Sequence, residues 1–167
     1  MKETPELIPL LREAFNYDPE TGIVTYARAR QNANAGARAG HRHKLGYRVL
    51  NFRKTLHREH RVIFAMMTGR WPEHEIDHKN NRGDDNRWEN LREATATQNK
   101  ANSVYKNASG FKGAYRKGEK WESLISRGGK LEYLGRFDTP EAAHAAYKAA
   151  ATEEFGEFAR FDRAYLD

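Results

Sequence analysis

The spacing of apolar positions along the chain changes several times, and each change marks an expected element. Apolar residues recur at helical spacing in 7–15 and in 57–68, so we expect a helix in each segment. Residues 17–22 have the composition of a turn, because Pro19 presets φ and Gly22 accepts a positive φ. The pattern also predicts strands at 23–26 and 47–52 and a loop at 28–40.

The middle of the chain combines a short strand, a polar loop and a helix start. Residues 75–78 have the pattern of a strand, and residues 79–90 form a long polar segment. Thr95 followed by Gln98 fits a capping box, in which the two side chains satisfy backbone N–H groups at a helix start. A helix that begins there would place Asn99 in its first turn.

The C-terminal part of the chain has the pattern of a small antiparallel sheet followed by a helix. Gly118-Glu119 and Gly128-Gly129 are two-residue hairpin signals between strand-like runs. Thr139 then caps an alanine-rich helix that has Pro140 at its first position. The three expected strands are 112–117, 120–127 and 130–137, with the helix packed across them. The fold class is therefore α+β, with domains at 1–102 and 109–167 and a polar linker at 103–108.

Composition narrows the class of protein. The 167 residues are 38% hydrophobic and 31% charged, which fits one ordinary globular domain or two small ones. The absence of cysteine excludes disulfides and cysteine-based zinc sites. The start of the chain lacks the apolar stretch of a signal peptide, and no run approaches membrane-spanning length. We therefore expect a cytoplasmic protein with no membrane partner.

The net charge of +6 is unevenly distributed along the chain. Residues 28–61 hold ten basic residues and a single acid, Glu59, whereas residues 100–136 hold nine basic and three acidic residues. Residues 138–167 hold three basic and seven acidic residues. Two basic zones predict two surfaces that face a polyanion, although solvated loops would give the same count. The Tyr, Trp and Gly within these zones favour nucleic acid.

Four polar residues between the basic zones offer the groups that metal-assisted phosphodiester cleavage needs. Asp77 provides a carboxylate suited to Mg²⁺, and His78 provides an imidazole that accepts a proton near neutral pH. Asn99 offers a second oxygen ligand, whereas Asn90 would fix the loop or orient the histidine. Neighbours on a strand point to opposite faces, so one site requires a distortion at Asp77-His78 or a position at the strand end. Each residue alone fits a surface or turn position equally well, and Asn86 is interpreted as a turn residue.

The string IDHKNNRGDDNRWENLREATATQN, residues 76–99, resembles the HNH nuclease family, and most closely its phage and intron-encoded homing branch. The resemblance extends over residues 15–102 and includes the turn at 17–22 and His60-Arg61. It implies a ββα-metal core at about 74–102. In that core Asp77 and Asn99 would be metal ligands, His78 the general base and Asn90 the structural loop residue. Asn80-Asn81 stands where relatives often have Asp-Gly.

Residues 109–161 resemble the AP2 DNA-binding domain through Ser109-Gly110-Phe111, Leu134-Gly135-Arg136-Phe137 and Thr139-Pro140-Glu141. In that family the three-stranded sheet lies in the major groove, whose width admits such an element. The resemblance implies that the sheet face and its flanks bind DNA, and the N-terminal basic zone predicts a second contact surface on the nuclease domain. The expected contacts are Lys112, Tyr115, Arg116, Lys117, Arg127, Tyr133 and Arg136, and then Arg42, Lys44, Arg48, Arg53 and Lys54.

These observations lead to one expected function and two rivals. We expect a monomeric phage or mobile-element endonuclease that hydrolyses double-stranded DNA. It would use one divalent metal ion, Mg²⁺ with Mn²⁺ able to substitute, and no structural zinc. One rival is a catalytically inactive DNA-binding or regulatory protein derived from such a nuclease. The other is a structure-specific RNA binder or nuclease.

Overall fold

The computed structural model describes residues 3–104 and 109–161, and the chain divides into two compact units, residues 1–94 and 95–167. The first unit ends at residue 94, earlier than the predicted domain end at 102, because the helix at 96–102 packs with the C-terminal part of the chain. Residues 105–108 of the predicted linker lie outside the described residues. Within the described ranges, no helix has both the length and the apolar character needed to cross a membrane.

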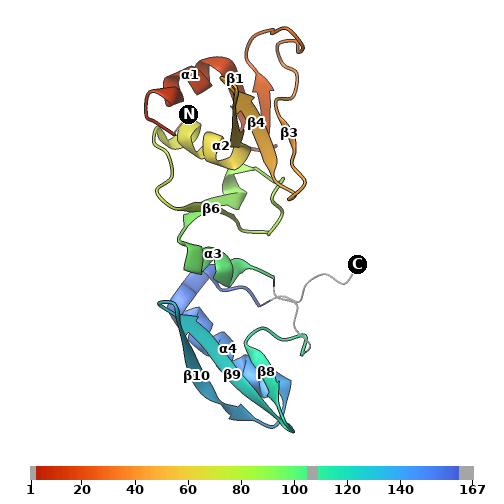
Figure 1. Ribbon diagram of the computed structural model, residues 1–167, viewed down its shortest axis with the longest axis vertical. Helices are drawn as coiled ribbons and strands as arrows, with labels where there is room; N and C mark the ends of the chain where they lie inside the picture. The colour runs from red at the N-terminus through yellow and green to blue at the C-terminus, as the bar shows by residue number, and fades with distance from the viewer. Residues whose placement is uncertain (1–2, 105–108, 162–167) are drawn as a thin grey trace. The chain divides into compact units, whose positions relative to one another are not determined.

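The first unit joins three small antiparallel sheets to two helices (Figure 1). One hairpin pairs β1 with β2, a second sheet has the order β3-β4-β5, and a second hairpin pairs β6 with β7. The elements are α1 (Leu7–Ala14), β1 (Phe15–Asp18), β2 (Ile23–Tyr26), β3 (His41–Arg42), β4 (Arg48–Phe52), β5 (Thr55–Arg58), α2 (Glu59–Thr68), β6 (Glu75–His78), a 3-10 turn (Trp88–Asn90) and β7 (Leu91–Ala94).

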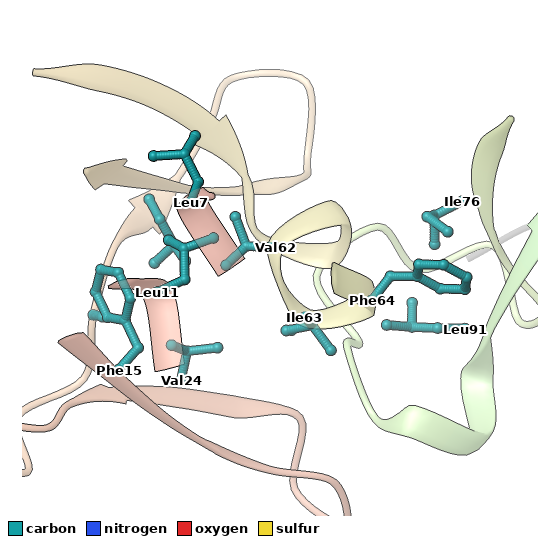
Figure 2. Close-up of a cluster of buried hydrophobic side chains, with 11 residues drawn as sticks. Leu7, Leu11, Phe15, Val24, Val62, Ile63, Phe64, Ile76 and Leu91 are labelled. Carbon is teal, nitrogen blue, oxygen red and sulfur yellow. The ribbon is translucent and has the colours of Figure 1, made fainter. Parts of the chain in front are cut away.

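A single apolar cluster holds these elements together, with α2 at its centre. Figure 2 shows α2 between two groups of side chains: α1, β1 and β2 supply Leu7, Leu11, Phe15 and Val24, and β6 and β7 supply Ile76 and Leu91. Val62 and Ile63 of α2 are fully buried. The β6–β7 hairpin has little apolar surface of its own, so its packing on Phe64 of α2 fixes its position.

Two expected boundaries in this unit differ from the structure. The predicted helix at 57–68 begins at Glu59, because Thr55–Arg58 forms β5 against β4. Leu91–Ala94 forms β7, a strand that was not predicted. The hairpin over residues 15–26 and the helix end at Gly69, with φ of 77°, are as the turn and stop signals indicate.

The second unit confirms the expected sheet-and-helix pattern. Strands β8 (Ala114–Lys117), β9 (Lys120–Arg127) and β10 (Lys130–Phe137) form an antiparallel sheet of order β10-β9-β8. Helix α4 (Pro140–Phe155) lies across the sheet, as Figure 1 shows, and a 3-10 turn (Gly156–Phe158) follows it. Thr139 caps α4 through the Ala142 N–H, and Gly113 lets Tyr147 of α4 pack directly on the backbone before β8. Helix α3 (Ala96–Asn102) begins with the predicted capping box of Thr95 and Gln98.

Candidate active site

His78 is the last residue of β6, and its side chain turns into the interior of the first unit. Only 5% of it is exposed, and its Nε2 lies 2.9 Å from Oδ1 of Asn86 in the following loop. The β6–β7 register is regular from Glu75 opposite Ala94 to His78 opposite Leu91. The strand is therefore not distorted at Asp77-His78, and His78 occupies the strand-end position that was the other expectation.

Asn86 links His78 to a buried carboxylate. Its Nδ2 donates a hydrogen bond to Oε1 of Glu59 at 2.9 Å, and only 1% of Asn86 is exposed. Glu59 is fully buried at the start of α2, where Arg48 Nε lies 3.1 Å from its Oε2. Arg48 also donates to the Ala39 carbonyl at 2.8 Å, so both ions of this buried pair are hydrogen-bonded.

This chain of contacts determines which nitrogen of His78 carries the proton. Because the Asn86 amide donates to Glu59 through Nδ2, its Oδ1 must accept from His78, and Nε2 must be the N–H group. The lone pair of the neutral ring then resides on Nδ1. We call the chain Arg48–Glu59–Asn86–His78 the relay; it defines the basic atom of the histidine.

The surroundings of His78 keep its ring neutral. His60 and Tyr47 pack beside it, with ring centroids 5.1 and 5.9 Å away. Burial lowers the pKa of His78, against the opposing effects of Asn86 and Asp77. Burial, and then the neighbouring His78, lower the pKa of His60 to about 3. A neutral imidazole is the form that accepts a proton, so this environment suits a general base.

His60 does not have the capping or phosphate-binding role that its sequence position near a helix start indicated. It is 3% exposed, and its Nδ1 has no hydrogen-bond partner among the described residues. His57, expected in the same role, lies on β5, where its ring stacks on Trp71. Both histidines are therefore interior side chains and neither caps a helix nor faces solvent.

Asp77 faces a different neighbour from His78. Asp77 is 3% exposed, and its Oδ2 accepts a hydrogen bond from Arg92 Nε at 2.9 Å across the β6–β7 pair. The described residues contain no group of three or more His, Asp or Glu side chains that could hold a metal ion. One carboxylate with an amide oxygen still fits Mg²⁺, which usually keeps waters and phosphate oxygens as its other ligands.

The other predicted ligand, Asn99, lies on α3 in the second unit. Asp77 belongs to the first unit, and the pairing of Asn99 with Asp77 stays a prediction.

Asn90 holds the loop between β6 and β7 in shape. Its Oδ1 accepts from the Asn80 N–H at 3.0 Å, and its Nδ2 donates to the Asp85 carbonyl at 2.7 Å. Asn81 supplies the left-handed residue of the turn that follows β6, with φ of 60°. Fixing the loop was one of the two roles expected of Asn90. The other, orienting His78, belongs to Asn86, which sequence reasoning had interpreted as a turn residue.

The N-terminal hairpin supports the same loop from outside. Tyr17 on β1 donates from its hydroxyl to the Asn86 carbonyl at 2.9 Å, and the Trp88 N–H donates to the Pro19 carbonyl at 3.0 Å. A Cβ on Gly22 would lie 2.5 Å from the Arg87 nitrogen, so only glycine permits this approach. Burial raises the pKa of the Tyr17 hydroxyl, which therefore stays a donor. The turn at 17–22 thus fixes the backbone of the residue that orients His78.

Two of the predicted DNA-contacting cations are used inside the fold. The Arg48 side chain is 11% exposed and is paired with Glu59, which disfavours the predicted DNA contact. The Lys112 ammonium donates to the carbonyls of Ala101 and, at 2.9 Å, Ser103 at the end of α3. Burial lowers the pKa of Lys112 to about 8. Lys112 therefore caps the end of α3, which disfavours the predicted DNA contact.

The other predicted cations differ in how they are engaged. Arg127 forms ion pairs with Glu132, Glu153 and Glu154, which offset its charge. Arg42 pairs with Asp84 at 3.5 Å while staying largely exposed. The remaining members are exposed or half-exposed and stay a prediction: Lys44, Arg53, Lys54, Tyr115, Arg116, Lys117, Tyr133 and Arg136.

Sequence reasoning missed the interior members of the site, although one signal was available. Glu59 is the single acidic residue among ten basic ones in residues 28–61, and a lone acid in such a stretch is a candidate buried counter-ion. Tyr47 has no comparable signal, because its contacts with the two histidines depend on how β4 and α2 pack.

Comparison with known proteins gives one match. No curated protein and no solved structure matches the chain significantly. Residues 57–101 match a family model described as HNH endonuclease, which covers less than half of the chain. This segment begins at His57 and includes Glu59, His78, Asn86 and Asn90, and it supports an HNH nuclease.

Proposed function

We propose that the protein is a metal-dependent DNA endonuclease with His78 as its general base. The observation that carries the proposal is the relay, which holds a neutral, buried histidine with a defined basic nitrogen inside the segment that matches HNH endonucleases. A purely structural role rarely requires a carboxylate, an amide and an imidazole that are hydrogen-bonded in sequence in a protein interior. Burying them is unfavourable unless every member is paired.

His78 would take a proton from water at Nδ1 as that water attacks the phosphorus. The P–O3′ bond would break and the leaving O3′ would take a proton from solvent water, giving a 3′-hydroxyl and a 5′-phosphate. The Nε2–H bond to Asn86 holds the ring in orientation, and the Glu59 carboxylate behind the amide stabilises the imidazolium that forms. A divalent ion held by Asp77 and Asn99 would neutralise negative charge on the phosphate. Mg²⁺ is the expected ion, with Mn²⁺ as a substitute.

The second unit would bind and position the duplex. Tyr115 on β8 and Tyr133 on β10 are 38% and 56% exposed, and Arg116, Lys117 and Arg136 are exposed on the same three-stranded sheet. This surface fits the AP2-like role inferred from sequence, mainly through phosphate contact and shape. A monomer encoded by a phage or mobile element remains part of the proposal.

Nicking of supercoiled plasmid DNA tests the activity. The wild-type chain should convert plasmid in Mg²⁺ or Mn²⁺ and not in EDTA. His78→Ala should lower the rate by a factor of about 100 to 10,000, the usual contribution of a general base. His41→Ala is the matched control, because His41 is exposed on β3. Equal rates for His78→Ala and wild type would disprove the assignment of the base.

The same assay separates the rivals. Duplex binding without metal-dependent cutting of any substrate would favour a regulatory DNA-binding protein. Tighter binding or cutting of RNA than of matched DNA would favour the RNA alternative.

A further inference from the structure

A second candidate binding site lies in the first unit, on a pocket that none of the relay residues line. The pocket has a volume of about 450 Å³, within the usual range for small-ligand sites. Three aromatic rings from three strands form its floor. Phe15 lies 5.7 Å from Tyr26 and 5.8 Å from Phe52, measured between ring centroids. The end of α1 closes one side through Leu10 and Ala14.

Arginines surround this aromatic floor. Arg30 holds its guanidinium 4.9 Å from the Tyr26 ring centroid, and Arg53 lies 5.8 Å from that of Phe52. Arg28 also lines the pocket and pairs with Glu13 at 3.1 Å. With one of three cations paired, the rim keeps a net positive charge. Flat rings with adjacent guanidinium groups match a ligand that has both an aromatic face and negative charge.

The backbone at Arg53 is conformationally unfavourable. Arg53 and Lys54 form the two-residue turn between β4 and β5, with φ of 49° and 63°. Such turns normally carry Asn-Gly, because residues with a Cβ cost about 1 to 2 kcal/mol each in this region. Local stability therefore does not explain an Arg-Lys pair here. A requirement for positive charge at the mouth of the pocket would explain Arg53, which lines it.

We propose that this pocket takes one unpaired nucleobase of a nucleic-acid strand. The base would stack against Tyr26 and Phe52, and its phosphates would lie against Arg30 and Arg53. An acidic peptide would satisfy the arginines but not the aromatic floor, so a nucleotide is the better fit. The proposal goes beyond the cleavage function, because binding here needs neither the metal nor His78.

The test uses the full-length chain in EDTA and a short single-stranded DNA with 2-aminopurine at one position. Stacking quenches the fluorescence of this base, so quenching on binding reports the pocket directly. Tyr26→Leu removes the ring and should abolish most of the quenching, whereas Tyr26→Phe keeps the ring and should preserve it. Loss of one stacked base should weaken binding about 5-fold to 100-fold. A matched RNA strand identifies which nucleic acid is preferred.

A second pair of variants keeps the test independent of folding. Arg53→Gly removes the cation at the rim and relieves the positive φ, so the variant should fold at least as well as wild type. Lys54→Gly removes the same charge from the same turn, but Lys54 does not line the pocket. Both variants should lose phosphate attraction, and only Arg53→Gly should also reduce quenching.

Three outcomes would overturn the proposal: no quenching by wild type, equal quenching by folded Tyr26→Leu, or equally tight binding of an abasic strand. Quenching without plasmid cleavage would support the pocket and count against the proposed nuclease. Cleavage without quenching would do the reverse.

Discussion

Replacing Asn86 with alanine should change the protonated nitrogen of His78. The substitution removes the acceptor of the Nε2–H bond and the donor to Glu59 in one step. Both partners are buried and would lose these bonds, although Glu59 would keep Arg48. The histidine would then be able to adopt the other tautomer, with its lone pair on Nε2.

The structure sets the size of the effect. Glu59 keeps Arg48 on both carboxylate oxygens, so the His78 Nε2–H is the group that loses its partner, and Asn86→Ala should lower the free energy of unfolding by about 1 to 3 kcal/mol. Cleavage should fall by about 100-fold or more, because the general base would present the wrong nitrogen. Denaturant unfolding measures the first quantity, and plasmid nicking measures the second.

The ¹⁵N chemical shifts of the His78 ring report the tautomer directly, whether or not the protein cuts DNA. Asn80→Ala is the control, because Asn80 makes three side-chain hydrogen bonds in the same loop, with Arg82, Asp85 and Asn90. It should destabilise the loop while His78 keeps its Nε2–H form. If folded Asn86→Ala also keeps that form, the relay does not set the tautomer and the reasoning fails.

Three further predictions concern the support of the site. The pKa of His60 is about 3 in the folded state against about 6.5 unfolded, so the unfolded chain binds the extra proton between these values and stability falls as pH drops. Two pH units below 6.5 the loss should be on the order of 3 kcal/mol, and His60→Phe should reduce this dependence in pH-resolved melts. Arg48→Met should lower the free energy of unfolding by about 3 to 5 kcal/mol in denaturant, because it leaves Glu59 without its cation. The salt dependence of DNA binding should not change, and a smaller salt slope in this variant would show that Arg48 contacts DNA. Gly22→Ala should lower the free energy of unfolding by about 1 to 3 kcal/mol and slow cleavage, because the added Cβ would meet the Arg87 backbone. A variant as stable and active as wild type would show that the close contact between Gly22 and the Arg87 backbone is not required.

The parts of the fold that follow local rules could be predicted from sequence. Thr95 and Gln98 form the expected capping box, and Thr139 with Pro140 starts α4 as predicted. Each of these signals lies within a few residues of the structure that it specifies. Strand β5 was not predicted because the turn before it contains Arg53 and Lys54 rather than Gly, so no turn signal in the sequence separated it from β4.

The interior of the site could not be predicted, because its contacts join distant residues. Asn86 and Glu59 are 27 positions apart, and only the packing of α2 against the loop brings them together. Charge was misread for the same reason. Arg48 counts as a cation in the sequence, yet its charge is neutralised by a carboxylate brought to it by the fold. Asp77 and His78 were singled out because adjacent chemical groups are visible in sequence, whereas the groups that orient them are not.

The hydrogen bond from Tyr17 to the Asn86 carbonyl joins residues 69 positions apart, and this separation bears on the order of folding. Contacts of such sequence separation form only after a long loop has closed, which makes them slow. We therefore expect the loop over residues 79–90 to reach its final shape after the hairpin β1–β2 and helix α2 have packed. A chain emerging from the ribosome would display its basic segment 28–61 before the relay exists. The newly made protein would thus gain affinity for nucleic acid earlier than the capacity to act on it.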